Sequence, residues 1–555
     1  MKRRLALLLT LCWCTPVFSA DLASARILVE QKRYDEAIVE FNTLIQSTPT
    51  NADLLIEAAR VNAWADHHPE SAALYQRVIV VAPQRRADVV LPLAWQLAWN
   101  NQHQEATPLF REAVTLNEAQ KNEALLGLAE SLAVTHQLPE ALATYQALSQ
   151  QAADPKARKG EARVLLWLDR YDEAIARYQD ILKTQPNDKE AQLGLARALN
   201  RSGRNLAAVS AYQTAIQNGI ALDTGTRVER ARALRWAGLE DLALQSLGDT
   251  AGQEAIDLRT RLKQETASHL RGEFESSRDS DKLRINAFTL GWKQRFSPAN
   301  IVDVSVRSAQ IEQGAADIQG RQLLARIGTR WGTVDTGLHW PALTLEVRDY
   351  AGWQTAAWKL QSKWIPKDFW RIDMEAGNET VETITALKNR VTLNCVAAST
   401  DWRFLPQWSA TLGGAVLRFD DHNQRTRLIG RIERVVLRDQ PRLTLGIEGM
   451  GFNDSDPSIY RGYYNPARYR EIKAYAHAEH ETAGWLLGAK LALGQLNETP
   501  GTQSGLYAWE LSATRDLAPM LKVHLYAGGS DSSALSRTGS GYTRDFVGAS
   551  LMWFY

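Results

Sequence analysis

Three polar side chains near the C-terminus have the types that acyl-transfer enzymes combine. Ser512 offers a hydroxyl nucleophile, His524 a base, and Glu510 an acid that could orient the base. They would be neighbours on adjacent strands, although a segment this rich in Ser and Glu also produces such a trio by chance. His477 and His480 differ in strand parity, so they face opposite sides of a strand and make a poor metal pair. We predict no catalytic site, no metal and no cofactor, and a lipid-modifying enzyme built on the trio stays an alternative.

Charged side chains recur at alternate positions in the second half of the chain. Over residues 343–348 the odd positions are Leu or Val, and the even positions are Thr, Glu and Arg. A period of two is typical of a β-strand with one apolar and one polar face. The polar face carries both signs of charge, at Arg326, Arg330, Glu346, Arg348, Arg371, Asp373, Glu375, Arg390, Arg431, Glu448, Lys473 and Glu510.

The elements that would position these charges are strands. After residue 265 we find sixteen strand-like segments, and their average spacing of about 18 residues fits one membrane-crossing strand plus a connection. Short links containing Pro298, Pro441 or Pro519 alternate with longer ones such as Gly377 to Lys388, while Gly332 to Pro341 is long where a short turn is expected. The sequence predicts a sixteen-stranded antiparallel transmembrane β-barrel with a polar, water-filled lumen. A soluble β-sandwich is the alternative.

Aromatic residues support the membrane assignment. Twelve of the 18 Trp lie after residue 265, and several stand near predicted strand ends, as in an interfacial girdle. The final residues, 551–555, alternate and end on Tyr555. This ending resembles the assembly signal of bacterial outer-membrane barrels.

The first half of the chain is a helical repeat array. A small residue is followed four positions later by an aromatic one, and this pair recurs every 33 to 35 residues. The pairs are Ala37/Phe41, Ser71/Tyr75, Ala106/Phe110, Ala141/Tyr145, Ala174/Tyr178 and Ala208/Tyr212. The spacing places both residues on one helix face, where the small one allows close approach of a neighbouring helix. These residues resemble the tetratricopeptide repeat, and a different α-solenoid is the alternative.

The N-terminus and the overall composition limit the cellular setting. Residues 1–20 have a basic start, a short apolar stretch and small residues before position 21, which predicts a secretory signal peptide. The formal net charge of +1 gives no basic excess that would favour a nucleic-acid partner. We therefore predict a signal peptide over residues 1–20, an α-solenoid of tetratricopeptide repeats over 21–265 and a β-barrel over 266–555.

The combination of signal, repeats and barrel resembles the outer-membrane porins that export bacterial exopolysaccharides, most nearly those for poly-β-1,6-N-acetyl-D-glucosamine. The stretch Arg461 to Tyr469 looks like a Tyr-rich, Pro-containing segment late in such barrels. The resemblance implies localisation in the outer membrane, with repeats in the periplasm that recruit a polysaccharide deacetylase or similar enzyme. The repeat array is much shorter here than in those porins.

The resemblance also implies a polysaccharide chain as the transported partner and outer-membrane lipid around the barrel. A lumen wall of mixed charge, with Tyr350, Tyr475 and Tyr526, suits a neutral or weakly charged sugar chain that makes weak, repeated contacts. For any single charge, solvation of the wall and pairing across strands is the simpler interpretation. Three tyrosines of a long link, Tyr460, Tyr463 and Tyr464, would either line the outer exit or pack on the rim. A cellulose-type export porin, and a closed barrel acting as a phage or surface receptor or adhesion scaffold, remain alternatives.

Overall fold

The computed structural model describes residues 21–152, 154–458, 461–499, 503–531 and 543–555. The predicted signal peptide and Tyr460 lie outside the described residues. The chain forms two compact units, of which the first ends at Leu195 and the second comprises Ala196–Tyr555. The second unit therefore contains the last helices together with all of the strands.

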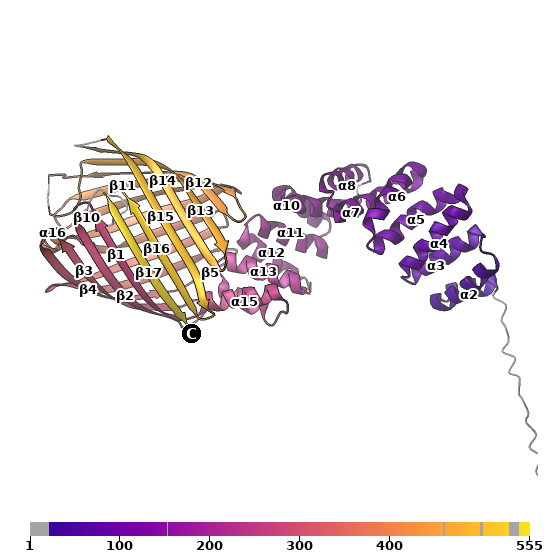
Figure 1. Ribbon diagram of the computed structural model, residues 1–555, viewed down its shortest axis with the longest axis horizontal. Helices are drawn as coiled ribbons and strands as arrows, with labels where there is room; N and C mark the ends of the chain where they lie inside the picture. The colour runs from indigo at the N-terminus through magenta and orange to yellow at the C-terminus, as the bar shows by residue number, and fades with distance from the viewer. Residues whose placement is uncertain (1–20, 153, 459–460, 500–502, 532–542) are drawn as a thin grey trace, which may run out of the picture. The chain divides into compact units, whose positions relative to one another are not determined.

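The first unit is built from helix pairs (Figure 1). Its helices are α1 (Leu22–Glu30), α2 (Tyr34–Ser47), α3 (Ala52–Trp64), α4 (His68–Val81), α5 (Arg86–Trp99), α6 (His103–Leu116), α7 (Lys121–Val134), α8 (Leu138–Ala152), α9 (Pro155–Trp167) and α10 (Tyr171–Thr184), and α11 (Lys189–Arg201) crosses into the second unit. The predicted small and aromatic residues are the core: Ala141 and Tyr145, for example, are fully buried. Three of the aromatic rings pack against a glycine of the next helix: Phe110 against Gly127, Tyr145 against Gly160 and Tyr178 against Gly194.

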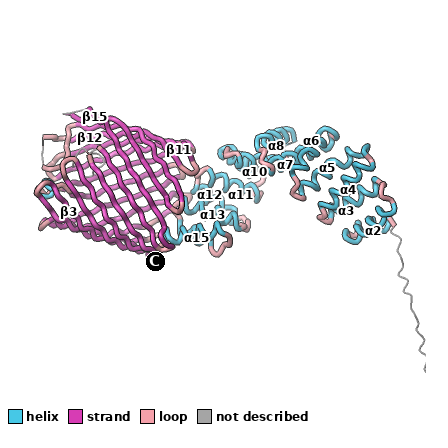
Figure 2. The backbone as a smooth tube through the Cα atoms, in the orientation of Figure 1, coloured by secondary structure: helices cyan, strands magenta, loops and turns pink. Residues whose placement is uncertain are grey.

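The second unit begins with the last repeats and continues as a barrel (Figure 2). Its remaining long helices are α12 (Asn205–Gln217), α13 (Thr224–Trp236), α14 (Glu240–Leu247) and α15 (Gln253–Thr266). Only two residues separate the end of α15 at Thr266 from the start of the first strand at His269. This short connection leaves little freedom between the last helix and the first strand.

The strands form one closed antiparallel sheet. They are β1 (His269–Asp279), β2 (Leu283–Arg295), β3 (Ile301–Gln313), β4 (Ala316–Gly328), β5 (Trp331–Thr333), β6 (Gly337–Tyr350), β7 (Trp353–Lys367), β8 (Trp370–Thr380), β9 (Thr392–Leu405), β10 (Trp408–Phe419), β11 (Gln424–Leu437), β12 (Arg442–Asp454), β13 (Arg468–Thr482), β14 (Trp485–Thr499), β15 (Gln503–Ala518), β16 (Leu521–Ser530) and β17 (Arg544–Phe554). Strand β1 pairs with both β2 and β17, so the ring is closed, and β5 is a three-residue piece beside β6. Within the described residues, sixteen long strands make the ring, and the predicted fold class is confirmed.

The two faces of the barrel wall differ in polarity as predicted. Outward positions carry apolar side chains in contact with the surroundings: Leu412, Leu491 and Leu493 are 66%, 62% and 72% exposed. Side chains directly across from one another in neighbouring strands share a face, so the register places the charged residues of alternate positions on the inner side. The barrel is therefore apolar outside and charged inside, which is the arrangement that a membrane-spanning barrel requires.

Two links differ from the expected pattern. The long link from Gly332 to Pro341 is a local hairpin, because Trp331–Thr333 pairs with the beginning of β6. The strand expected near Asn389 begins at Thr392, since residues Ile384–Lys388 form a short helix, α16. Among the described residues, no helix has both the length and the apolar character that crossing a membrane would need.

Candidate functional site: the barrel lumen and its two ends

One side of the lumen wall is lined by neighbouring ion pairs. Arg348 donates to Glu346, two residues along β6, at 2.7 Å, and both side chains are largely buried. Lys359 on β7 lies 3.2 Å from Glu375 on β8. Arg371 lies 2.7 Å from Asp373 on the same strand. Each of these three cations thus has a carboxylate partner close by, and the pairs present hydrogen-bonding groups along this part of the wall.

The opposite side of the wall repeats this arrangement. Glu448 on β12 accepts from Lys473 on β13 at 3.2 Å and from Lys490 on β14 at 3.3 Å. Glu510 on β15 lies directly across from Lys490 in the strand register. Arg431 on β11 lies 3.6 Å from Glu433. Ion pairs therefore join charged side chains of β12, β13 and β14, with the Arg431–Glu433 pair on β11 beside them and Glu510 across from Lys490 on β15.

Two of the predicted tyrosines belong to these networks. Tyr475 donates to Glu433, and its ring has the ammonium of Lys490 at 4.4 Å from the ring centre. Tyr526 donates to Glu273 at 3.1 Å. Their hydroxyls are engaged with wall carboxylates.

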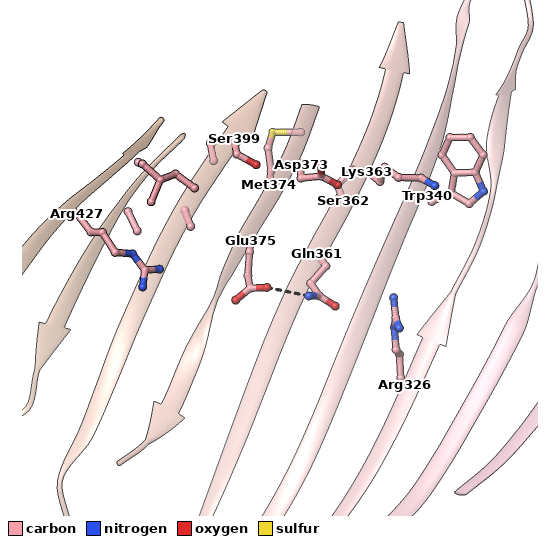
Figure 3. A pocket seen from close by; sticks show the side chains of 15 residues that line it. Arg326, Trp340, Gln361, Ser362, Lys363, Asp373, Met374, Glu375, Ser399 and Arg427 are labelled. Carbon is pink, nitrogen blue, oxygen red and sulfur yellow. Dashed lines mark hydrogen bonds between the residues drawn. The ribbon is translucent and has the colours of Figure 1, made fainter. Parts of the chain in front are cut away.

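Cavities lie along the inner wall. One has a volume of about 530 Å³, and Arg326, Asp373 and Glu375 are among its lining residues (Figure 3). Gln361 donates to Glu375 at 2.8 Å across its floor. A second cavity, of about 490 Å³, shares Arg326 and is also lined by Glu346 and Arg348. Five of the predicted residues therefore line these two cavities, and Arg326 lines both of them.

At the outer end, the β8–β9 link (residues 381–391) folds into the lumen. Glu382 of this link accepts hydrogen bonds from Arg307 at 2.9 Å and Tyr350 at 2.8 Å, which belong to β3 and β6. On the same side Ile384 and Leu387 pack among inner residues of β2, β3, β4 and β6. Val381 and Ala386 pack among inner residues of β9 and β10. The link therefore occupies the sector of the lumen between these two groups of strands.

The β12–β13 link closes against the β8–β9 link. Thr383 donates to the carbonyl of Gly462 at 2.5 Å. Gly462 has φ of 98°, and a Cβ there would lie 2.4 Å from the backbone nitrogen of Ala386, so the approach of the two backbones requires glycine. Tyr463 is buried against Phe419, with ring centres 4.1 Å apart. Tyr464 packs edge-on against Phe452, so both described tyrosines of the predicted set lie in aromatic contacts at the rim.

At the inner end, the last helices of the second unit contact the barrel mouth. Arg330, in the link after β4, donates to Asp241 of α14 at 2.6 Å and 3.0 Å. Helix α12 has no side-chain cap of its own, and Asp368 of the β7–β8 turn accepts from the backbone N–H groups of Leu206 and Ala207 at 2.5 Å and 2.9 Å. An acidic residue at a helix N-terminus satisfies free N–H groups and favours the helix dipole.

The structure gives each remaining predicted residue a definite place. Arg390 is exposed in the turn after α16, with φ of 56°, and so lies in a link and not on a strand. His524 bonds Thr514 at 2.8 Å, whereas Ser512 faces Tyr526 in the strand register. Within the described part of the chain, no group of three or more His, Cys, Asp or Glu side chains is arranged to hold a metal ion.

Several contributors were not predicted from the sequence. Glu382, Asp368 and Asp241 all lie outside the strands, where parity gives no guide to direction. The β8–β9 link did carry a signal, because Val381, Ile384, Ala386 and Leu387 are too apolar for an exposed outer loop. No comparable signal marks Asp368, whose partner lies more than 160 residues away in the sequence.

Comparison with known families agrees with this architecture. Residues 160–223 match the tetratricopeptide repeat model, and residues 303–482 match the PgaA membrane beta barrel domain. The helical part thus contains a segment similar to tetratricopeptide repeats, and the barrel contains a segment similar to the PgaA membrane barrel. The predicted resemblance to the repeat-bearing outer-membrane export porins is confirmed, and neither matched family is of a catalytic kind. The protein is accordingly an outer-membrane protein with its helical repeats in the periplasm.

Solved structures resemble parts of the fold at low sequence identity. A bacterial polysaccharide outer membrane secretin is 14% identical, with a TM-score of 0.44 over 52% of this chain and 99% of its own. A tetratricopeptide repeat protein from Parabacteroides merdae is 14% identical, with a TM-score of 0.37 over 43% of this chain and 96% of its own. YrrB, described as a repeat protein with an unusual peptide-binding site, is 19% identical, with a TM-score of 0.29 over 31% of this chain and 91% of its own. No curated protein matches the chain.

Proposed function

We propose that the protein exports a polysaccharide of the poly-N-acetylglucosamine type through its barrel. The observation that carries the proposal is the position of the PgaA-type match: residues 303–482 include every residue that lines the lumen cavity of about 530 Å³. The matched segment therefore contributes the whole lining of that cavity, which supports a path through the barrel.

The chemistry of the wall fits a chain with little net charge. Carboxylates and cations are paired within hydrogen-bond distance, as in Arg348 with Glu346 and Lys473 with Glu448. Such pairs offer many donors and acceptors to sugar hydroxyls and amides. Export needs contacts that are weak and repeated, because a strong site would slow release.

The repeats would recruit a periplasmic polymer-modifying protein, such as a deacetylase. Stacked helix pairs present extended surfaces that repeat proteins use for binding partners. Removal of residues 21–195, with the signal retained, should leave a barrel that still assembles but secretes less polymer. Normal output from that deletion would contradict the recruitment role.

The export role is tested by filling the lumen. Ala397 and Ser399 line the lumen cavity of about 530 Å³, so A397W/S399W introduces two large side chains into it. We expect several-fold less cell-surface polymer, detected with a lectin for N-acetylglucosamine, and a smaller conductance in planar bilayers. The matched control is V396W, because Val396 is 64% exposed on the outer face. Unchanged secretion by the filled barrel, at equal amounts in the outer membrane, would refute the proposal.

A further inference from the structure

Four repeats end their first helix with an exposed tryptophan. Helices α3, α5, α9 and α13 end at Trp64, Trp99, Trp167 and Trp236. These side chains are 55%, 57%, 41% and 55% exposed, respectively. Tryptophan is highly buried on average, so exposure recurring at one position of the repeat needs an explanation.

The four positions are structurally equivalent. Each tryptophan stands two residues before the left-handed residue of the turn between the paired helices, which is Asp66, Asn101, Asp169 or Gly238. Equivalent positions of stacked repeats lie along one edge of a solenoid. Within the first unit, Trp64, Trp99 and Trp167 therefore follow one edge, and Val134, 48% exposed, takes the same position in α7.

Neighbouring side chains hold the indoles while leaving much of their surface in water. Tyr34 lies 6.1 Å from Trp64 between ring centres. His68 lies 5.5 Å from Trp99, and the guanidinium of Arg163 lies 5.7 Å from the ring centre of Trp167. A ring fixed in this way loses little conformational entropy when a ligand stacks on it.

Polar side chains follow two of the exposed tryptophans in the chain. Asn100, next to Trp99, donates to Gln102 at 2.8 Å. Asp169, close to Trp167, accepts from Tyr171 at 2.6 Å. A pyranose ring has an apolar face of C–H groups and a rim of hydroxyls, so it stacks on an indole while amides and carboxylates bind its rim. A protein-docking surface would instead have an apolar centre that is continuous across neighbouring residues.

The last tryptophan belongs to the second unit and lies close to the barrel mouth. A Cβ on Gly238, two residues after Trp236, would lie 3.1 Å from the ring of Trp340 on β6. Gly238, Trp340 and Arg326 together line a cavity of about 170 Å³ at the barrel mouth. Trp340 and Arg326 also line the lumen cavity of about 530 Å³. The turn that carries the last tryptophan thus opens onto the start of the path.

We propose that Trp64, Trp99 and Trp167 are stacking sites for sugar rings of the exported polymer, and that Trp236 is a further stacking site beside the barrel mouth. The repeats would then bind the polysaccharide itself. The identity of the polymer rests on the proposed export function, whereas the stacking role is tested separately by binding.

The test uses the full-length protein in detergent and a hexasaccharide of β-1,6-linked N-acetylglucosamine, with affinity measured by calorimetry. Each lost ring should weaken binding by about threefold to tenfold. We expect W64A/W99A/W167A to lose most of the measured affinity, while V134A, at the equivalent position, leaves it unchanged. V134W should tighten binding by about threefold, because it adds a ring to the series. All four side chains are exposed, so the circular dichroism spectra should match the wild type.

Binding to the lumen is separated from binding to the repeats by repeating the titration in the A397W/S399W background. Loss of affinity on removing the three rings in that background supports the stacking role. Wild-type affinity in the triple variant, or no gain in V134W, would overturn it even if the barrel still exports polymer. The triple variant could also keep its affinity for the oligosaccharide and lose a periplasmic protein partner. That result would overturn the proposal and show that the rings form a protein-docking site.

Discussion

Arg330 and Asp241 form a two-pronged ion pair between the barrel mouth and helix α14, with N–O distances of 2.6 Å and 3.0 Å. Their side chains are only 13% and 12% exposed. Burial of two charges is costly unless both are paired and hydrogen-bonded, and here the geometry satisfies that condition. Together with the cap that Asp368 provides for α12, the pair fixes the last repeats against the barrel.

Breaking this pair should destabilise the helical part of the second unit. R330A leaves Asp241 buried without its partner, which costs about 3 kcal/mol by comparison with other broken buried pairs. We expect an earlier helical unfolding transition, monitored by circular dichroism at 222 nm in detergent. The exchanged pair R330D/D241R should recover part of the loss, because the attraction is restored with its direction reversed.

An exposed pair provides the control for the ion-pair experiment. Lys183 and Asp180 lie 2.8 Å apart within α10, and both side chains are well exposed. K183A should leave the transition unchanged, since exposed pairs contribute little. Equal shifts from R330A and K183A would show that the mouth contact does not stabilise the helices.

Glu382 should control how much of the outer lumen is open. Its side chain is 15% exposed and accepts from Arg307, Tyr350 and Gln322. E382A removes these bonds and leaves Arg307 without its partner, so the β8–β9 link should leave the lumen part of the time. We expect a larger or more variable single-channel conductance, whereas E312Q, at a more exposed pair on β3, should behave as wild type.

The same contact predicts a pH dependence. Burial raises the pKa of Glu382, but the charge and hydrogen bonds of Arg307 and the hydroxyl of Tyr350 outweigh it, and the net pKa falls below the ordinary 4.5. A lowered pKa means that the contact is fully stabilising above about pH 4.5 and is lost as pH falls through the lowered value. Conductance should therefore be constant from pH 8 to 5 and rise in stronger acid. E382Q should lack this rise in conductance at acid pH. An identical rise in E382Q would show that protonation of Glu382 does not cause it.

Gly462 should be needed for the contact between the two links. In G462A the new Cβ would meet the backbone of Ala386 at 2.4 Å, and the positive φ adds strain. We expect the Thr383 contact to break and conductance to change in the direction of E382A. G314A is the matched control, because Gly314 has φ of 62° but no atom within 4 Å of a Cβ. Equal effects of the two variants would mean that backbone strain alone is responsible.

The sequence predicted those features that depend on local periodicity. The period of about 34 residues identified the repeats, and the alternation identified sixteen strands, with starts mostly within a few residues of the observed ones. Inward direction was predictable for Glu346 or Lys473 because parity along a strand determines it. Neither inference needed knowledge of any contact between distant segments.

What the sequence could not predict depends on contacts between distant segments outside regular strands. Arg330 was assigned to the wall by parity, yet its partner Asp241 belongs to a helix 89 residues earlier. Glu382 lies in a link whose path depends on packing against two separate groups of strands. In both cases the side-chain direction follows from tertiary contacts, for which a single sequence carries no periodic signal.

The packing of the repeats gives a last prediction, independent of the barrel. Gly160 of α9 faces Tyr145, and an added Cβ would lie 2.3 Å from that ring. The ring is fully buried and cannot move aside, so G160A should destabilise the first unit by about 1 to 3 kcal/mol through overpacking. G225A is the control, because Gly225 in the first turn of α13 has only the Asp223 carboxylate nearby, at 3.7 Å, and the helix gains from alanine. Thermal unfolding of the full-length protein is followed by circular dichroism. The temperature of the first unfolding transition should be lower for G160A and unchanged for G225A. An unchanged transition temperature in G160A would contradict this account of the repeat interface.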